Sequence, residues 1–274
     1  MTQAEAEGKG ETLTHENPNY MLSGKYSRWD TPLGGPDHVR LTSLSPLRRP
    51  KQQMINVKQR TLVEQSADLI IDAASVGTFL PGDRLVEADI ARKIGISRVP
   101  VREALRLLES QGVVVSIPYR GMRLMAVTNS SAASITRVRV ALEAMAVRDC
   151  VAYATDAALD EVRDAARQYR AAEDADPVGQ RRADRAFHRA LCVATGNAAL
   201  LSSWTAIVRQ VSVLWSLVDR GSNSGTLASE HEAIVDAIAA RDAGRAASLV
   251  EEHLAPVMEI DFESALQRKI VQRG

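Results

Sequence analysis

Four residues in the second half of the chain have the types and the spacing of a metal site. Asp184 and His188 are four residues apart, so their side chains share one face of a helix. His231 and His253 each lie eleven residues from Asp242, in a predicted turn between two helices. In an antiparallel helix pair, residues equally far from the turn stand side by side, here about 16 Å from it. The spacing therefore predicts that the two histidines meet across a helical hairpin, provided both face the same way.

One carboxylate and three imidazoles suit a borderline divalent ion. We expect zinc, with nickel, manganese and iron as alternatives. An octahedral ion would keep two positions open for water or an acid group, whereas a tetrahedral ion would keep none. A metal with open positions can also activate water for hydrolysis, but no convincing general base stands beside these residues, so an enzyme is not expected. The other alternative is that the four side chains are satisfied separately inside a helical bundle.

The elements that must position these residues are predicted to be helices. Between residues 131 and 268 the apolar side chains recur with helical period, and breaks fall near residues 155–156, 174–177, 196–197, 221–225 and 242–244. About six helices result, with no credible strand, so this domain is predicted to be an all-α bundle. Trp204 and Trp215 are expected in its core or at a subunit contact rather than in a pocket.

Residues 51–127 have a different pattern, in which three helices precede two strands joined by a tight turn. Gly95 is placed to close the second helix, and Ser97 to cap the third. The predicted helices cover residues 56–74, 87–94 and 98–110, and the strands cover residues 113–117 and 122–127. This order of elements is that of a winged helix-turn-helix. The fold is therefore predicted to be mainly α, with a small β-hairpin wing.

The third of these helices has the charge pattern of a DNA-reading helix. Arg98, Arg102 and Arg106 follow at four-residue intervals and so lie along one face. Arginine in the major groove can bind guanine bidentately or grip phosphates. The whole chain has no net charge, but residues 51–123 hold eleven Lys and Arg against eight Asp and Glu. The alternative is an ordinary solvated helix face that happens to be basic.

Two segments, a Pro-Gly-x-Arg-Leu motif at residues 81–85 and a Ser-Arg-x-Pro-Val-Arg-Glu-Ala-Leu motif at residues 97–105, lie in this region. With these motifs the sequence resembles the DNA-binding domain of the GntR superfamily. The resemblance implies base or phosphate contacts from Arg98 and Arg102, a supporting contact from Arg106 and a minor-groove wing tip at Arg120-Gly121. Arg84 in the first matching segment is a further DNA-binding candidate. The matching segments are Leu80-Pro81-Gly82-Asp83-Arg84-Leu85 and Ser97-Arg98-Val99-Pro100-Val101-Arg102-Glu103-Ala104-Leu105.

One position departs from the pattern of this superfamily. Some members place an arginine early in the second helix, where this chain has Ala88 and then Arg92 one turn later. The residue that fills this role is therefore open.

The second half of the chain resembles the FCD effector domain of FadR-type members of the same superfamily. The matching residues include Arg139-x-x-Leu-Glu143, Asp184-x-x-Phe-His188, Gly196-Asn197 and the two later histidines. In that family an aspartate and three histidines bind a metal, against which small organic acids bind. The resemblance implies that Asp184, His188, His231 and His253 are metal ligands. Arg139 and Asn197 are candidates for effector binding; alternatively, Arg139 pairs with Glu143 and Asn197 caps a helix.

The remaining features set the context of these two domains. Residues 1–50 are punctuated by glycine and proline and are predicted to be a flexible tail. Cys150 and Cys192 lie among apolar residues and are predicted to be buried thiols. No apolar stretch approaches the roughly 20 residues of a membrane span, and the polar N-terminus is unlike a secretory signal. We therefore expect a cytoplasmic protein without a membrane partner.

Together these observations predict a homodimeric transcription regulator. Its two recognition helices would bind a roughly palindromic operator in double-stranded DNA. A small organic acid that enters the helical domain would modulate that binding. An alternative keeps the DNA binding but makes the metal purely structural, with no effector.

Overall fold

The computed structural model describes residues 61–172, 176–218 and 224–273. The predicted tail (1–50) and the predicted start of the first helix at residue 56 lie outside the described residues. Within these ranges, no helix combines the length and the apolar character needed to cross a membrane.

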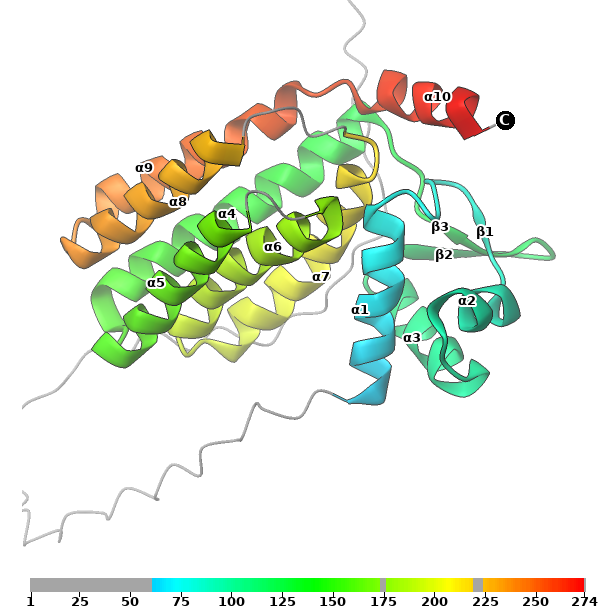
Figure 1. Cartoon of the computed structure of the whole chain (residues 1–274), viewed down its shortest axis with the longest axis horizontal. Coiled ribbons are helices and arrows are strands. Elements are labelled where there is room, and N and C mark those ends of the chain that lie inside the picture. The colour runs from blue at the N-terminus through cyan, green and yellow to red at the C-terminus, as the bar shows by residue number, and fades with distance from the viewer. Residues whose placement is uncertain (1–60, 173–175, 219–223, 274) are drawn as a thin grey trace, which may run out of the picture. The chain divides into compact units, whose positions relative to one another are not determined.

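The first described region is a winged helix-turn-helix (Figure 1). Its sheet has the strand order β1-β3-β2, with both pairings antiparallel. The bounds of α2 and α3 agree with the sequence prediction, whereas β1 was not predicted, because two residues are too short to show an alternating pattern. The elements are α1 (Leu62–Ser75), β1 (Arg84–Leu85), α2 (Glu87–Ile94), α3 (Arg98–Ser110), β2 (Val114–Ile117) and β3 (Gly121–Leu124).

Local interactions at the helix ends explain why these elements begin and end where they do. Thr61 and Glu64 form a reciprocal capping box at the start of α1. Gly95 closes α2 with a φ of 72°, a left-handed conformation that is inexpensive for glycine. Ser97 occupies the N-cap position of α3, as predicted, but its side chain makes no capping hydrogen bond.

The second region contains the six predicted helices, and no strand occurs among its described residues. Most of these helices begin at a residue whose side chain accepts a hydrogen bond from the first turn, at Thr128, Thr155, Asp176, Asn197 and Asp242. Figure 1 shows α4 to α9 running alongside one another as a bundle. The helices are α4 (Asn129–Tyr153), α5 (Asp156–Ala171), α6 (Pro177–Ala194), α7 (Ala198–Trp215), α8 (Ser224–Ala239) and α9 (Ala243–Leu254).

The segment after α9 differs from the prediction, in which the helical period continues without a break from residue 244 to residue 268. The chain instead forms the 3₁₀ helix η1 (Ala255–Glu259) and then α10 (Phe262–Arg273). Pro256 lies at the start of η1, and its missing backbone N–H cannot continue the hydrogen bonds of an α-helix. Proline was thus the sequence signal for this break.

The buried apolar side chains form clusters that do not follow the expected domain boundary. One cluster lies within the bundle and includes Phe187, Leu191 and Ile234. Another combines Leu105 and Leu108 of the recognition helix with side chains from α7, η1 and α10, including Val213, Leu214, Val257, Phe262 and Ala265. The two regions therefore share part of a core.

Candidate functional site

The four predicted ligand residues come together inside the bundle. Asp184 and His188 lie on α6, His231 on α8 and His253 on α9, and one ligand atom from each falls within 4.8 Å of all the others. His253 Nε2 lies 3.2 Å from His231 Nε2 and 3.3 Å from His188 Nε2. Asp184 Oδ1 lies 3.7 Å from His231 Nε2 and 3.9 Å from His188 Nε2.

This geometry fits a bound divalent ion. Two nitrogens held about 2.05 Å from one zinc ion at tetrahedral angles stand about 3.3 Å apart, which matches the separations of 3.2 and 3.3 Å between the imidazoles. A hydrogen bond does not account for the approach of His253 Nε2 to His188 Nε2, because a neutral imidazole carries one N–H and the Nδ1 atom of each ring faces a carboxylate, which favours the N–H there. The cluster can therefore hold a metal through three nitrogens and one oxygen.

Burial keeps the imidazoles of His188 and His231 in the neutral form that binds metals. His188 and His231 are fully buried. Burial, together with the neighbouring His188 and His253, lowers the pKa of His231 to about 2. Burial also lowers the pKa of His188, against the opposing effect of Glu143. At neutral pH the rings of His188 and His231 are unprotonated, so no proton has to leave these two side chains before a metal binds.

Two glutamates hold the outer nitrogens of the ligand histidines. Glu143 Oε2 lies 2.7 Å from His188 Nδ1, and Glu230 Oε2 lies 2.6 Å from His253 Nδ1. A carboxylate at Nδ1 favours the tautomer that leaves the Nε2 lone pair for a metal. His231 Nδ1 is buried and has no hydrogen-bond partner among the described residues; its ring packs instead against Phe187 and Tyr169.

Glu143 also anchors a buried network behind the cluster. Its Oε1 accepts hydrogen bonds from Arg139 Nε and Trp204 Nε1, each at 2.7 Å. Burial opposes ionisation of this carboxyl, but Arg139 and His188 outweigh it and hold the pKa of Glu143 well below its usual range. Sequence reasoning placed Glu143 in a motif that matches the FCD domain and named it as a possible partner of Arg139, but it did not predict the contact with His188 and gave Glu230 no role. The adjacency of Glu230 to His231 was no signal, since it contacts His253 across the hairpin.

A cavity of about 200 Å³ lies beside the ligand cluster. Asp184 and His253 form part of its wall, as does the predicted effector-binding residue Arg139. Trp215, expected in the core or at a subunit contact, lines this cavity as well. The remaining lining residues are mostly apolar: Thr226, Leu227, Glu230, Leu254, Pro256, Val257 and Ile260.

The two predicted effector-binding residues occupy different environments. Arg139 forms a salt bridge with Glu143 through Nε, which the sequence offered as the alternative to effector binding. Its side chain also lines the cavity beside the metal cluster. Asn197 is the N-cap of α7, which was the other interpretation of this residue, and its side chain accepts a hydrogen bond from Leu200 N at 3.1 Å. It does not belong to the residues that line the cavity beside the metal cluster.

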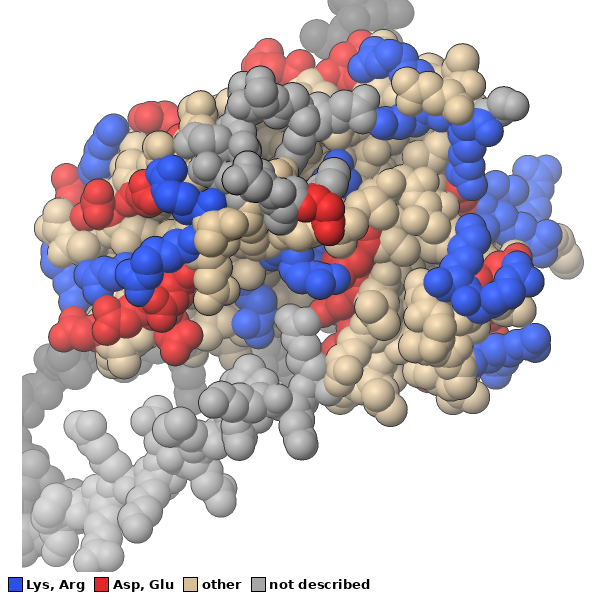
Figure 2. Space-filling model, in the orientation of Figure 1, with Lys and Arg blue, Asp and Glu red and all other residues tan. Residues whose placement is uncertain are grey.

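The predicted DNA-reading arginines are exposed on α3. Arg102 Nε lies 3.1 Å from the Glu87 carboxylate, and Arg106 Nη1 lies 3.2 Å from Glu103. The Arg98 side chain forms no ion pair or hydrogen bond with any described residue. Figure 2 shows Lys and Arg side chains gathered over the part of the molecule that carries α2, α3 and the strands.

The wing presents the other predicted DNA contacts. Gly121 has a φ of 76°, and Tyr119, two residues before it, has a φ of 60°. Tyr119 is fully exposed in the turn of the hairpin. Arg84 and Arg120 are also exposed, and a Cβ added at Gly121 would lie 3.6 Å from Arg84 Nε. Arg84 of β1 therefore lies against the wing tip. Arg92 of α2 is largely exposed and pairs with Asp89 at 2.9 Å.

Both regions are similar to known proteins. Residues 62–124 match the model of bacterial regulatory proteins of the gntR family, and residues 134–256 match that of the FCD domain. The probable D-xylose utilization operon transcriptional repressor of Paenarthrobacter nicotinovorans is 30% identical over 199 residues, which cover 71% of this chain and 86% of that protein. The regulator LutR of Bacillus subtilis is 28% identical over 210 residues, which cover 67% of this chain and 94% of that protein.

A solved structure shows the same fold. Escherichia coli McbR superposes with a TM-score of 0.61 at 23% identity, over 77% of this chain and 99% of that chain. The two family models together account for the DNA-binding region and the helical region described above. The chain therefore belongs to the GntR family of bacterial transcription regulators, in which it combines the family's DNA-binding domain with an FCD domain, and it is a DNA-binding regulator rather than an enzyme.

Proposed function

We propose that this regulator responds to a small organic acid that binds beside a zinc ion in its helical domain. The observation that carries the proposal is the convergence of Asp184, His188, His231 and His253 beside a cavity. Asp184 and His253 of this cluster line the cavity together with Arg139. Zinc is the expected ion because its preferred distances fit the imidazole spacing. Nickel, manganese and iron remain alternatives.

The residues of the cavity suit a carboxylate ligand. A bound divalent ion would supply a positive anchor for a carboxylate oxygen. The Nε of Arg139 is engaged by Glu143, so its contact with the acid would come from the other nitrogens of the guanidinium. Trp215, Leu254 and Val257 would cover the hydrocarbon part of the molecule.

We infer that a homodimer binds the DNA. Two-fold symmetry would place two copies of α3 in successive major grooves of a roughly palindromic operator. The side chain of Arg98 is available to bind a base or a phosphate. Arg102 and Arg106 would give up their ion pairs with Glu87 and Glu103 and bind the DNA instead. Arg84, Arg120 and Gly121 would contact the adjacent minor groove. The acid would act on operator affinity only if it binds differently to the free and the DNA-bound arrangements.

Elemental analysis of the purified protein tests the metal centre. Wild type is expected to carry about one metal ion per chain, and His231→Ala is expected to lose it. His15→Ala, a histidine far from the cluster in sequence, serves as the control and should retain the metal. Absence of metal from the wild type, even after incubation with zinc, nickel and manganese, would refute the site.

A thermal-shift screen of small organic acids then tests the effector. An acid that binds at the centre should raise the melting temperature of the metal-loaded wild type and leave that of His231→Ala unchanged. If the metal stabilises the protein but no acid adds to this effect, the metal is structural and the effector proposal is wrong.

A further inference from the structure

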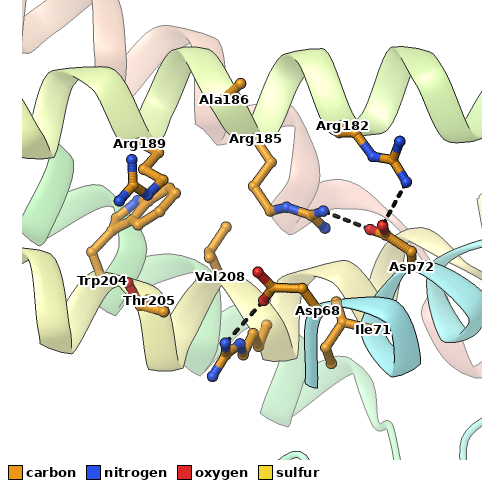
Figure 3. Close-up of a pocket in the computed structure, with 11 residues that line it drawn as sticks. Asp68, Ile71, Asp72, Arg182, Arg185, Ala186, Arg189, Trp204, Thr205 and Val208 are labelled. Atoms are coloured by element: carbon orange, nitrogen blue, oxygen red, sulfur yellow. Dashed lines mark hydrogen bonds and ion pairs between the residues drawn. The ribbon is translucent and has the colours of Figure 1, made fainter. Parts of the chain in front are cut away.

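A second cavity, of about 220 Å³, lies between α1 of the DNA-binding region and the helices α6 and α7 of the bundle (Figure 3). It shares no lining residue with the cavity beside the metal cluster. Its walls combine charged side chains with apolar ones. The lining residues are Asp68, Ile71, Asp72, Arg182, Arg185, Ala186, Arg189, Trp204, Thr205, Val208 and Arg209.

Among the residues that line this cavity, arginines outnumber aspartates. Four of the lining residues are arginines and two are aspartates, which leaves an excess of two positive charges. Figure 3 shows Arg182 and Arg185 pointing from α6 towards the same aspartate of α1. The Asp72 carboxylate lies 2.8 Å from Arg182 Nη2 and 2.6 Å from Arg185 Nη2. The single carboxylate of Asp72 therefore forms ion pairs with two guanidinium groups.

Arg209 supplies a buried donor at the same cavity. Its side chain is 6% exposed and lies 2.9 Å from Asp68 through Nη2, while Nη1 donates to Gln111 Oε1 at 2.7 Å. Its Nε is buried and has no hydrogen-bond partner among the described residues. Asp68 and Gln111 therefore fix the Arg209 guanidinium at the wall of the cavity.

We propose that this cavity binds a small doubly charged anion, either a dicarboxylate or a phosphate group, independently of the metal centre. Planar guanidinium groups match the oxygen pairs of both classes. Ile71 and Val208 provide an apolar wall for a short hydrocarbon part. The volume is sufficient, since a cavity of about 150 Å³ holds a benzene molecule.

Occupation of this site would act on the contact between the two regions of the protein. The aspartates belong to α1, and the arginines belong to α6 and α7. An anion that takes hydrogen bonds from Arg185 competes with Asp72 for the same guanidinium. Anion binding and the attachment of α1 to α6 are therefore coupled, and each makes the other less favourable.

Calorimetric titration of the full-length protein after EDTA treatment tests the proposal, with succinate and inorganic phosphate as separate probes at constant ionic strength. Arg185→Gln is expected to weaken binding roughly tenfold, because it removes a charged hydrogen bond to the anion. Asp72→Asn is expected to strengthen binding about fivefold, because it removes the competing carboxylate. Arg167→Gln is the matched control, an exposed arginine of α5 that is paired with Asp164, and should bind as the wild type does.

The opposite responses of the two variants decide the result. Saturable binding of either probe that Arg185→Gln weakens and Asp72→Asn strengthens supports the site, and the probe that binds identifies the class of anion. The proposal is overturned if neither probe saturates at about 10 mM, or if Arg185→Gln or Asp72→Asn binds as the control does. Melting curves show whether each variant is folded, and Arg182→Gln at the exposed rim replaces Arg185→Gln if the latter is unfolded. Because the protein is metal-free, this outcome is independent of the metal analysis above.

Discussion

Replacing Glu143 by glutamine is expected to weaken both the fold and the binding of metal. The carboxylate is fully buried and meets three donors: Arg139 Nε and Trp204 Nε1 at one oxygen, and His188 Nδ1 at the other. A glutamine amide offers one acceptor oxygen and one NH₂ group. In either orientation, its NH₂ group faces at least one of these donors, and the charge that balances Arg139 is lost.

The size of both effects follows from this burial. The side chain of Arg139 is 4% exposed and that of Glu143 is 0% exposed, and breaking such a buried pair costs about 3–5 kcal/mol. Because glutamine keeps one acceptor, we expect about 3 kcal/mol, or a loss of roughly 6–12 °C in melting temperature. Loss of the carboxylate behind a ligand histidine is expected to weaken metal binding by roughly 10–100-fold.

Two assays measure these effects. Thermal unfolding of EDTA-treated protein gives the stability, and competition with a chelator gives the metal affinity. Glu230→Gln is the matched control, because Glu230 also contacts the Nδ1 of a ligand histidine but its side chain is 39% exposed. Water screens that pair, so its loss is expected to cost less than about 1 kcal/mol. Equal losses of melting temperature in the two variants would refute the argument from burial.

Three further predictions concern the DNA-binding region and the cysteines. Arg98→Ala should weaken binding to DNA selected from a random pool by roughly tenfold, as measured by fluorescence anisotropy. Arg167→Ala on α5 is the control and should bind this DNA as the wild type does. Equal affinities of the two variants for the DNA would contradict the role of α3. Gly121→Ala places a side chain on a residue with a φ of 76°. Urea unfolding should therefore show a free energy of unfolding about 1 kcal/mol lower than that of the wild type. An unchanged free energy of unfolding would argue against strain at the wing. Burial raises the pKa of the Cys150 thiol to about 12 and also raises that of Cys192, so neither should react with a thiol reagent at pH 8 until the protein unfolds. Rapid labelling of the native protein would contradict this.

The sequence alone predicted the elements whose bounds depend on residues close to them in the chain. The bounds of α2 and α3 followed from a left-handed glycine after one helix and an N-cap position before the next. The meeting of His231 and His253 followed from equal distances to a turn, because two helices of a hairpin rise by the same amount per residue.

Features that depend on distant parts of the chain were not predicted. The two-residue strand β1 exists only because Arg84 and Leu85 pair with β3. The contacts of Glu143 join α4 to α6 and α7, and no spacing within one helix reveals them. The break after Leu254 had a local signal in Pro256, but helical periodicity in the following segment obscured it.

The place of α10 in the buried core has a consequence for protein synthesis. Val257, Phe262 and Ala265 belong to the same apolar cluster as the recognition helix, yet they leave the ribosome only after all of the bundle. Until then the first region displays an uncovered apolar surface, a state that favours association with other chains. The DNA-binding region, which is made before the bundle, therefore completes its core only after the bundle has been made, and a half-made chain lacks the part of the core that supports its recognition helix.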